Sequence, residues 1–195
     1  MAASSSKKPV AKATPKQNVS ETVNKLNPMP GTDANTSVME LFVAELKDTL
    51  WAENHLVNAL PKMVAAAGSK DLKRGLADHQ EITKTHAARL EEILELLGEK
   101  IVAKKCDAME GLTMSGEHVI ENTIMNSPTR DLGIIMSGLK VENFEITTYK
   151  GLIQVANSLG KTDVVGLLQQ TLDEEIESSN MLTKMSQSLM SNQPA

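Results

Sequence analysis

Residues 135–159 read IMSGLKVENFEITTYKGLIQVANSL, and this stretch is the most informative part of the chain for its fold. Its apolar residues recur every three or four positions, as one face of a long helix requires. Two carboxylates interrupt that face near its middle, although a buried, unpaired carboxylate is strongly unfavourable. The stretch therefore predicts a core helix whose carboxylates must be neutralised by a proton or a cation. The face consists of Ile135, Gly138, Glu142, Glu145, Tyr149, Leu152, Ala156 and Leu159.

The composition of the chain favours helices over sheet. Apolar residues make up 41% of the 195 residues, whereas aromatic residues make up only 2%, and Met occurs 11 times. Leu, Ala, Glu, Lys and Met are good helix formers. Residues 1–36 lack apolar periodicity and carry several helix-breaking prolines. We expect a disordered tail rich in Lys, Ser and Pro over residues 1–36 and one helical domain over residues 37–191.

Charge and cysteine content limit the partners and the compartment. The net charge is −5, so the chain as a whole is not built to coat nucleic acid. The five lysines of residues 1–36 allow at most a weak contact with an anionic surface. Cys106 is the only cysteine, which excludes an intrachain disulfide, and no apolar run has the length of a membrane span. We expect a cytoplasmic protein without a membrane partner.

The helical pattern predicts a bundle of four long helices. Ser37 and Glu40 have the spacing of a capping box and open the first helix, in which Pro61 should cause a kink or a local break. The joins between the long helices are short, long and short. This connectivity is that of a ferritin-like four-helix bundle with one long crossover, which here carries a short extra helix. The expected helices cover residues 37–67, 69–97, 110–124, 129–159 and 162–190.

Polar residues interrupt the apolar face of every long helix near its midpoint. Antiparallel helices of similar length bring their midpoints to one level, so these residues should converge in the middle of the bundle. Carboxylates and imidazoles in such a cluster are the ligands that a pair of divalent metal ions requires. We therefore predict a dinuclear iron or manganese site. Its candidate ligands are Glu53 in the first long helix, His79 and His86 in the second, Glu142 and Glu145 in the third, and Glu175 in the fourth.

This cluster matches the usual ligand pattern only in part. Dimetal bundles use one Glu from each of two helices and a Glu-x-x-His pair from each of the other two. The second helix offers Thr83-x-x-His86, where the Glu is replaced, and the fourth offers Glu175-x-x-Ser178, where the His is replaced. His79 lies one turn from Thr83 and is a candidate to compensate.

A second hypothesis needs no metal. The glutamates of the centre would then be protonated or hydrogen-bonded to histidine and to Tyr149, and the chain would be a non-catalytic dimeric helical protein. Tyr149 has two interpretations, as a hydrogen-bond donor to a carboxylate or as ordinary core filler. Cys106 has no neighbouring His in the sequence and is interpreted as a packing thiol.

Several segments resemble the bacterial YciE/YciF family over about residues 38–190. Two of them are fairly specific: residues 105–112 read KCDAMEGL, and residues 140–149 read KVENFEITTY. Three others agree in order and spacing: LVNALPKM at 56–63, the segment 79–90, and TLDEE at 171–175.

The resemblance implies a ferritin-like bundle, a homodimer and a part in stress responses. The third long helix is also similar to that of rubrerythrins, whose Glu-x-x-Glu pair serves a di-iron site that reduces peroxide. That similarity implies that Glu142, Glu145, Glu53 and Glu175 are metal ligands. The combined expectation is a ferritin-like stress-associated protein that handles peroxide or iron at an incomplete dimetal site. Whether the chain is an enzyme, and which residues would be catalytic, is left open by the sequence.

Overall fold

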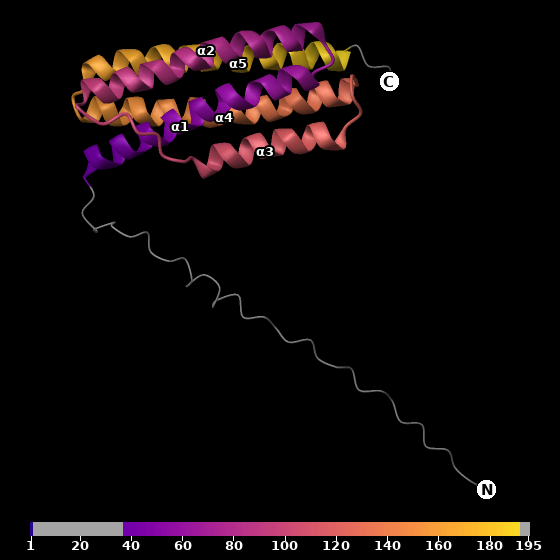
Figure 1. Ribbon diagram of the computed structural model, residues 1–195, viewed down its shortest axis with the longest axis horizontal. Helices are drawn as coiled ribbons and strands as arrows, with labels where there is room; N and C mark the ends of the chain where they lie inside the picture. The colour runs from indigo at the N-terminus through magenta and orange to yellow at the C-terminus, as the bar shows by residue number, and fades with distance from the viewer. Residues whose placement is uncertain (2–36, 192–195) are drawn as a thin grey trace. The chain divides into compact units, whose positions relative to one another are not determined.

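The computed structural model describes residues 37–191, together with Met1, and all regular structure in this part of the chain is helical. The disorder expected over residues 1–36 concerns residues outside the described part. Four long helices and one shorter helix follow one another (Figure 1). Their bounds are α1 (Val38–Ala66), α2 (Lys70–Leu96), α3 (Asp107–Asn122), α4 (Pro128–Ser158) and α5 (Thr162–Ser191).

The four long helices form a bundle, and α3 lies against its side. Helices α1 and α2 pack as one hairpin and α4 and α5 as another, while α1 also contacts α4 and α2 also contacts α5. Helix α3, in the crossover between the hairpins, packs against α1 and α4. The all-α, ferritin-like fold with a helix in its long crossover is therefore confirmed.

Side-chain caps define where the helices begin. The predicted capping box is present: Glu40 N donates to Ser37 Oγ at 3.1 Å, and Ser37 N donates to Glu40 Oε2 at 2.7 Å. At the other end of the bundle, the buried Asp131 carboxylate accepts hydrogen bonds from Gly68 N at 2.6 Å and Ser69 N at 2.8 Å. Asp131 therefore fastens the first turn of α4 to the turn between α1 and α2.

The sequence of α1 suggested a kink or a break at Pro61, and the structure excludes the break because α1 is continuous. Proline has no N–H to donate to the carbonyl four residues earlier, which leaves Val57 O without its helical partner. Gln80 of α2 supplies the missing donor, since its Nε2 lies 2.9 Å from Val57 O. A side chain from the neighbouring helix thus compensates for the proline.

Helix α3 begins earlier than the sequence suggested, at Asp107 rather than at residue 110. Cys106 occupies the N-cap position, where its Sγ accepts a hydrogen bond from Met109 N at 3.5 Å. Both side chains are buried against Ala52, Leu56 and Val141. Cys106 therefore acts as a helix cap and packing residue, in agreement with its interpretation as a structural thiol.

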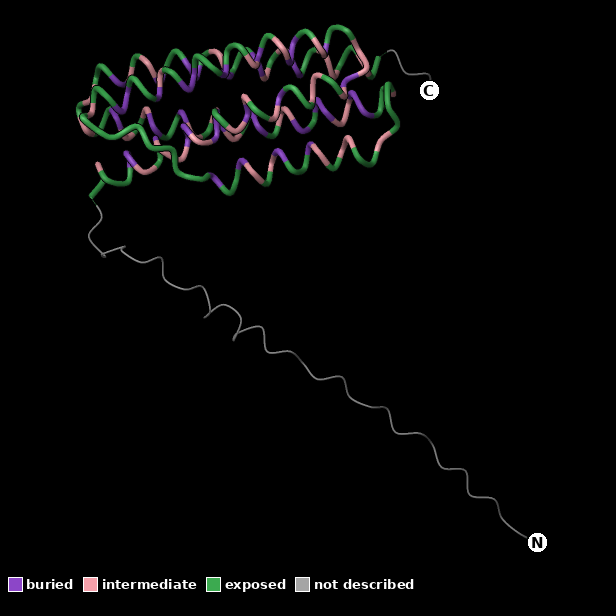
Figure 2. The backbone as a smooth tube through the Cα atoms, viewed as in Figure 1, coloured by how far each residue is buried: buried purple, intermediate pink, exposed green. Residues whose placement is uncertain are grey.

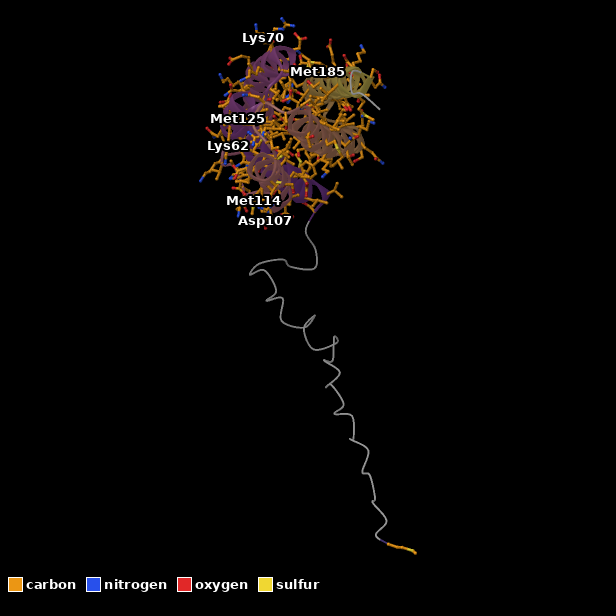
Figure 3. All side chains as sticks on the ribbon, turned by 90° about the vertical axis from the view of Figure 1, so that its right-hand side faces the viewer. Lys62, Lys70, Asp107, Met114, Met125 and Met185 are labelled. Atoms are coloured by element: carbon orange, nitrogen blue, oxygen red, sulfur yellow. The ribbon has the colours of Figure 1, made fainter. Side chains whose placement is uncertain are left out.

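The interior of the bundle is divided into apolar layers with a polar level between them. One apolar cluster includes Phe42, Leu46 and Leu168, and another includes Leu76 and Ile134. Buried positions follow the inner faces of the helices (Figure 2). Viewed from its end, the bundle has side chains filling the space between the helices, with those of Lys62 and Lys70 at its periphery (Figure 3). Among the described helices, none has the length and hydropathy of a membrane span.

Candidate metal centre

All six predicted ligand residues lie in the interior of the bundle. They come from α1, α2, α4 and α5, and each is carried on the inward face because its spacing places it in line with apolar core residues. The polar level therefore contains four carboxylates and two imidazoles almost without contact with solvent. The exposed fractions are 0% for Glu53, His86 and Glu175, 1% for Glu145, 2% for Glu142 and 6% for His79.

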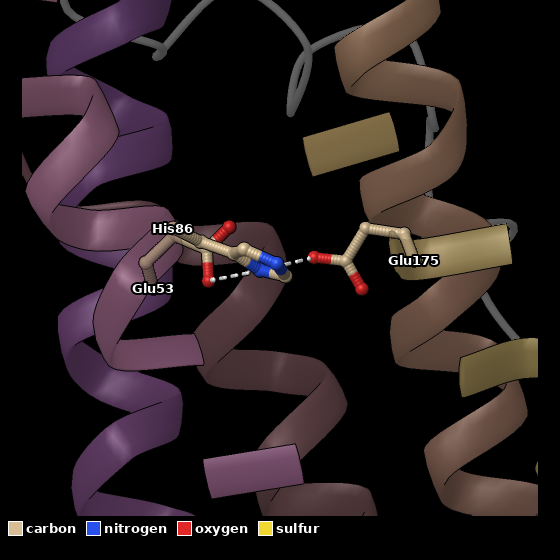
Figure 4. Close-up of side chains that lie close together, drawn as sticks. All are labelled: Glu53, His86 and Glu175. Carbon is tan, nitrogen blue, oxygen red and sulfur yellow. Dashed lines mark ion pairs between the residues drawn. The ribbon is translucent and has the colours of Figure 1, made fainter. Parts of the chain in front are cut away.

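Glu53, His86 and Glu175 form the first group. One ligand atom from each lies within 4.8 Å of the others. His86 Nδ1 is 2.8 Å from Glu175 Oε1 and 3.7 Å from Glu53 Oε2 (Figure 4). His86 Nδ1, Glu175 Oε1 and Glu53 Oε2 are buried and have no hydrogen-bond partner. This arrangement leaves ligand atoms pointing at a common space.

His79, Glu142 and Glu175 form the second group, again with one ligand atom from each within 4.8 Å of the others. His79 Nε2 lies 3.3 Å from Glu142 Oε1, while Nδ1 of the same ring is 3.0 Å from Ser178 Oγ. Glu175 therefore belongs to both groups.

The two residues that replace the expected ligands face the centre but have other partners. Thr83 is buried, and its hydroxyl donates to His79 O of its own helix at 2.9 Å. Ser178 is buried, and its hydroxyl lies against the His79 ring.

Glu145 is outside both groups, yet it is the least satisfied side chain of the centre. Both of its carboxylate oxygens are buried and have no hydrogen-bond partner. Buried polar atoms in native proteins nearly always have a partner. Across the described residues, every buried side-chain nitrogen or oxygen without a hydrogen-bond partner belongs to the centre. These atoms are Glu53 Oε2, His86 Nδ1, Glu142 Oε2, and both carboxylate oxygens of Glu145 and Glu175.

Burial and mutual repulsion shift the ionisation of this cluster. Burial raises the pKa of Glu142 and Glu145 well above the ordinary carboxyl value, and the charges of Glu175 and Glu53 raise it further. Burial disfavours the charged form of His86, but Glu175 and Glu53 outweigh it and raise its pKa to about 10. Burial also works against ionised Glu175, yet His86 holds its pKa below the ordinary value. Without a metal ion, protons and a charged His86 neutralise the centre.

Tyr149 is a hydrogen-bond donor to the centre, which decides between the two interpretations of this residue. Its hydroxyl donates to Glu53 Oε1 at 2.5 Å, and the whole side chain is buried. Burial and the nearby carboxylates raise the pKa of the phenol well above its ordinary value, so Tyr149 stays a donor. It therefore fixes one oxygen of Glu53 and leaves the other facing His86.

The sequence pattern missed Glu174 and Arg89, which hold His86 from outside the centre. Glu174 Oε2 is 2.9 Å from His86 Nε2. Arg89 binds the same carboxylate with two guanidinium nitrogens, at 2.5 and 2.9 Å. Carboxylates that hold the outer nitrogen of a metal-binding histidine fix its orientation and tautomer. The sequence contains three consecutive acidic residues, Asp173, Glu174 and Glu175. Only Glu175 lies on the core face, so the apolar spacing did not point to Glu174.

These donors fit a pair of hard or borderline divalent cations. Four carboxylates and two neutral imidazoles supply oxygen and nitrogen ligands, and four negative charges balance two divalent ions. Such ions would bind the buried carboxylate oxygens that have no hydrogen-bond partner. Fold and site together define a ferritin-like helical bundle with a carboxylate–histidine centre between its two hairpins.

Comparison with known proteins places the chain within a family. It belongs to the family described as a domain of unknown function, DUF892, which matches residues 37–195. The chain is 35% identical to protein YciF of Escherichia coli strain K12 over 150 residues, which cover 76% of this chain and 90% of YciF. The resemblance to the YciF family is thereby confirmed.

Solved structures of relatives have the same fold. The crystal structure of the E. coli stress protein YciF aligns with a TM-score of 0.78 and 32% identity, covering 82% of this chain and all 100% of that one. YcfI from Rhodopseudomonas palustris aligns with a TM-score of 0.75 and 30% identity, covering 78% of this chain and 97% of that one.

Proposed function

We propose that this chain binds two divalent metal ions, iron or manganese, at the carboxylate–histidine centre. The observation that carries the proposal is the set of buried carboxylate oxygens without partners, arranged around Glu175 in two groups. Burying several carboxylates without partners is costly unless a cation accompanies them. Surface acidic clusters do not raise this question, because water solvates them.

The residues of the two groups define two metal positions. Glu53, His86 and Glu175 would hold one ion, and His79, Glu142 and Glu175 the other. Glu145, which lies outside both groups, would supply a further carboxylate. When bound, iron or manganese would supply a centre able to react with peroxide or dioxygen. The chain's own part is to hold Glu53 through Tyr149 and to exclude water with the apolar layers on either side.

A part in stress responses and a homodimeric assembly belong to the same proposal. The E. coli relative is described as a stress protein. We extend this role to the present chain, because the two proteins share their fold and more than 30% of the aligned residues. Sedimentation velocity of the full chain tests the dimer, and a monomer at all concentrations would contradict it.

A metal-free polar core is the alternative, and one observation favours it. The His86 ring lies 2.8 Å from Glu175, where the protonated imidazole would serve as an internal cation. Protons on Glu142, Glu145 and Glu53, whose pKa values burial raises, would complete the neutralisation. This arrangement leaves both Glu145 oxygens without partners, whereas a metal ion would bind them.

Metal analysis of the purified chain distinguishes the two possibilities. Protein from cells supplemented with iron or manganese should contain about two ions per chain. Glu175→Gln should lose both ions, because Glu175 belongs to both groups. Glu177→Gln is the matched control, since Glu177 is exposed on the same helix two residues away and should keep both ions. Wild-type protein free of metal from both cultures would contradict the proposal and support the metal-free core.

A further inference from the structure

An apolar cavity lies directly beside the second group of the centre. Its volume is about 50 Å³, and His79 and Glu142 form part of its wall. All five helices contribute to the wall, including helix α3 of the crossover. The apolar wall includes Leu60 of α1, Leu76 of α2, Leu112 of α3, Val141 of α4 and Leu182 of α5.

Few polar atoms in this wall are available to a polar ligand. The Thr113 hydroxyl lies 3.1 Å from Met109 O, 2.9 Å from Glu110 O and 2.8 Å from His55 Nε2, so its hydrogen-bonding capacity is used. Ser137 is the other hydroxyl of the wall, and Glu142 has one carboxylate oxygen, Oε2, without a hydrogen-bond partner. A buried water needs two to four polar partners, and small apolar cavities that lack them stay dry. The cavity is therefore suited to a molecule that is weakly hydrated.

Size restricts the occupant further. An apolar cavity of about 150 Å³ accommodates benzene or xenon, and this cavity is smaller. A lipid chain or an aromatic metabolite is too large for it, whereas a diatomic molecule fits. A hydrophilic oxidant such as peroxide would lose its hydrogen bonds to water on entering the apolar part.

We propose that this cavity binds a small, uncharged and weakly hydrated molecule of the size of dioxygen and holds it beside His79 and Glu142. The chemical relevance of this binding rests on the proposed function. The inference adds the class of substrate that the centre would receive. The binding itself requires only the apolar wall and does not depend on a metal ion.

Xenon and dissolved dioxygen, applied to the full chain after treatment with a chelator, test the cavity. Methyl NMR signals report the binding, since the cavity wall includes Met63 and Met181. Ala59→Leu adds volume to the wall and should weaken xenon binding about tenfold. Ala44→Leu is the matched control, because Ala44 is half-buried on the same helix but lies against a different surface hollow.

The expected result is that xenon shifts the Met63 and Met181 methyl signals in the wild type and in Ala44→Leu. Ala59→Leu should show the weakened binding together with an unchanged circular dichroism spectrum. Leu112→Ala, which enlarges the cavity, should strengthen binding and provides a second variant if Ala59→Leu does not fold. Equal xenon binding by wild type and Ala59→Leu, or ordered water in the cavity, would overturn the inference. Metal content, measured on the same preparations before the chelator is added, decides the proposed function separately.

Discussion

His86 and Glu174 are joined by a contact of 2.9 Å between Nε2 and a carboxylate oxygen, on the side of the imidazole that faces away from the centre. Arg89 holds the Glu174 carboxylate with two nitrogens, so the ring is anchored from α2 and α5 together. The other ring nitrogen, Nδ1, is thereby kept toward Glu53 and Glu175. Glu174 is a positioning residue in this arrangement and does not contact the proposed metal positions.

Removal of this anchor should weaken metal binding without removing a ligand. Glu174→Ala frees the outer nitrogen of His86, and loss of such a partner lowers metal affinity about 10–100-fold. Competition with a chelator of known affinity measures the change. Glu177→Ala, an exposed glutamate on the same helix, is the control and should bind as the wild type does. Unchanged affinity in Glu174→Ala would show that packing alone orients His86.

The metal-free protein should become less stable as the pH rises from 6.5 toward 10. The pKa of His86 is raised from 6.5 to about 10, so the folded state binds a proton that the unfolded state releases in this window. The resulting stabilisation is complete below pH 6.5 and is lost as the pH passes about 10. Glu142 and Glu145, whose pKa is also raised, act in the same direction above their ordinary value of 4.5.

Urea denaturation at a series of pH values measures this dependence. Each additional proton bound by the folded state changes the free energy of unfolding by about 1.4 kcal/mol per pH unit. The lowered pKa of His79 has the opposite effect, but only below pH 6.5. Metal binding requires deprotonated ligands, so metal affinity should increase with pH over the same window. A free energy of unfolding that rises with pH in the metal-free chain would contradict the assignment of these protons.

Neutral substitutions at the carboxylate pair should separate stability from metal binding. Glu142→Gln/Glu145→Gln replaces two buried carboxylates by uncharged groups of similar shape. We expect the metal-free protein to gain about 1–3 kcal/mol in its free energy of unfolding at neutral pH, because folding no longer requires the uptake of the protons that keep these two buried carboxyls neutral. The same variant should bind less metal. Glu91→Gln/Glu92→Gln, exposed on α2, is the control for the change in net charge. A strongly destabilised double variant would indicate that the ionised pair supports the fold.

Loss of the Tyr149 hydroxyl should destabilise the bundle. Tyr149→Phe leaves Glu53 Oε1 buried without its donor, and a buried acceptor without a partner costs about 1–3 kcal/mol. Thermal and chemical denaturation measure the loss. Supplying iron or manganese should recover part of it, since a cation can bind the freed oxygen. Identical denaturation midpoints for the two proteins would mean that water replaces the hydroxyl.

Apolar spacing was sufficient to predict the bundle and the residues that face its centre. The three- and four-residue spacing around Glu142 and Glu145 places them inward, and the same spacing places Glu53, His86 and Glu175 opposite them. This inference works because helix geometry alone decides which side of a helix a residue occupies. The spacing does not determine the pairings between helices, so it could not show that Glu175 belongs to both groups.

Features that depend on a neighbouring helix were not predictable from local patterns. Pro61 signals a broken helix in the sequence, yet Gln80 from α2 supplies the donor that keeps α1 continuous. Cys106 is an unusual N-cap, so the start of α3 was placed too late. In the sequence Glu174 has the pattern of a surface acid, and only the packing of α2 against α5 pairs it with Arg89. Each of these cases joins residues from different helices or relies on an uncommon cap.

The membership of Glu175 in both groups has a consequence for how the centre would fill. On the proposed function, an ion held by Glu53, His86 and Glu175 would already engage the carboxylate that an ion held by His79 and Glu142 also needs. Binding at one position would then change the affinity at the other, and the change would be reciprocal. A metal titration of this chain should therefore not follow the curve of two equal, independent sites, and Glu175 would be the residue that couples the two binding events.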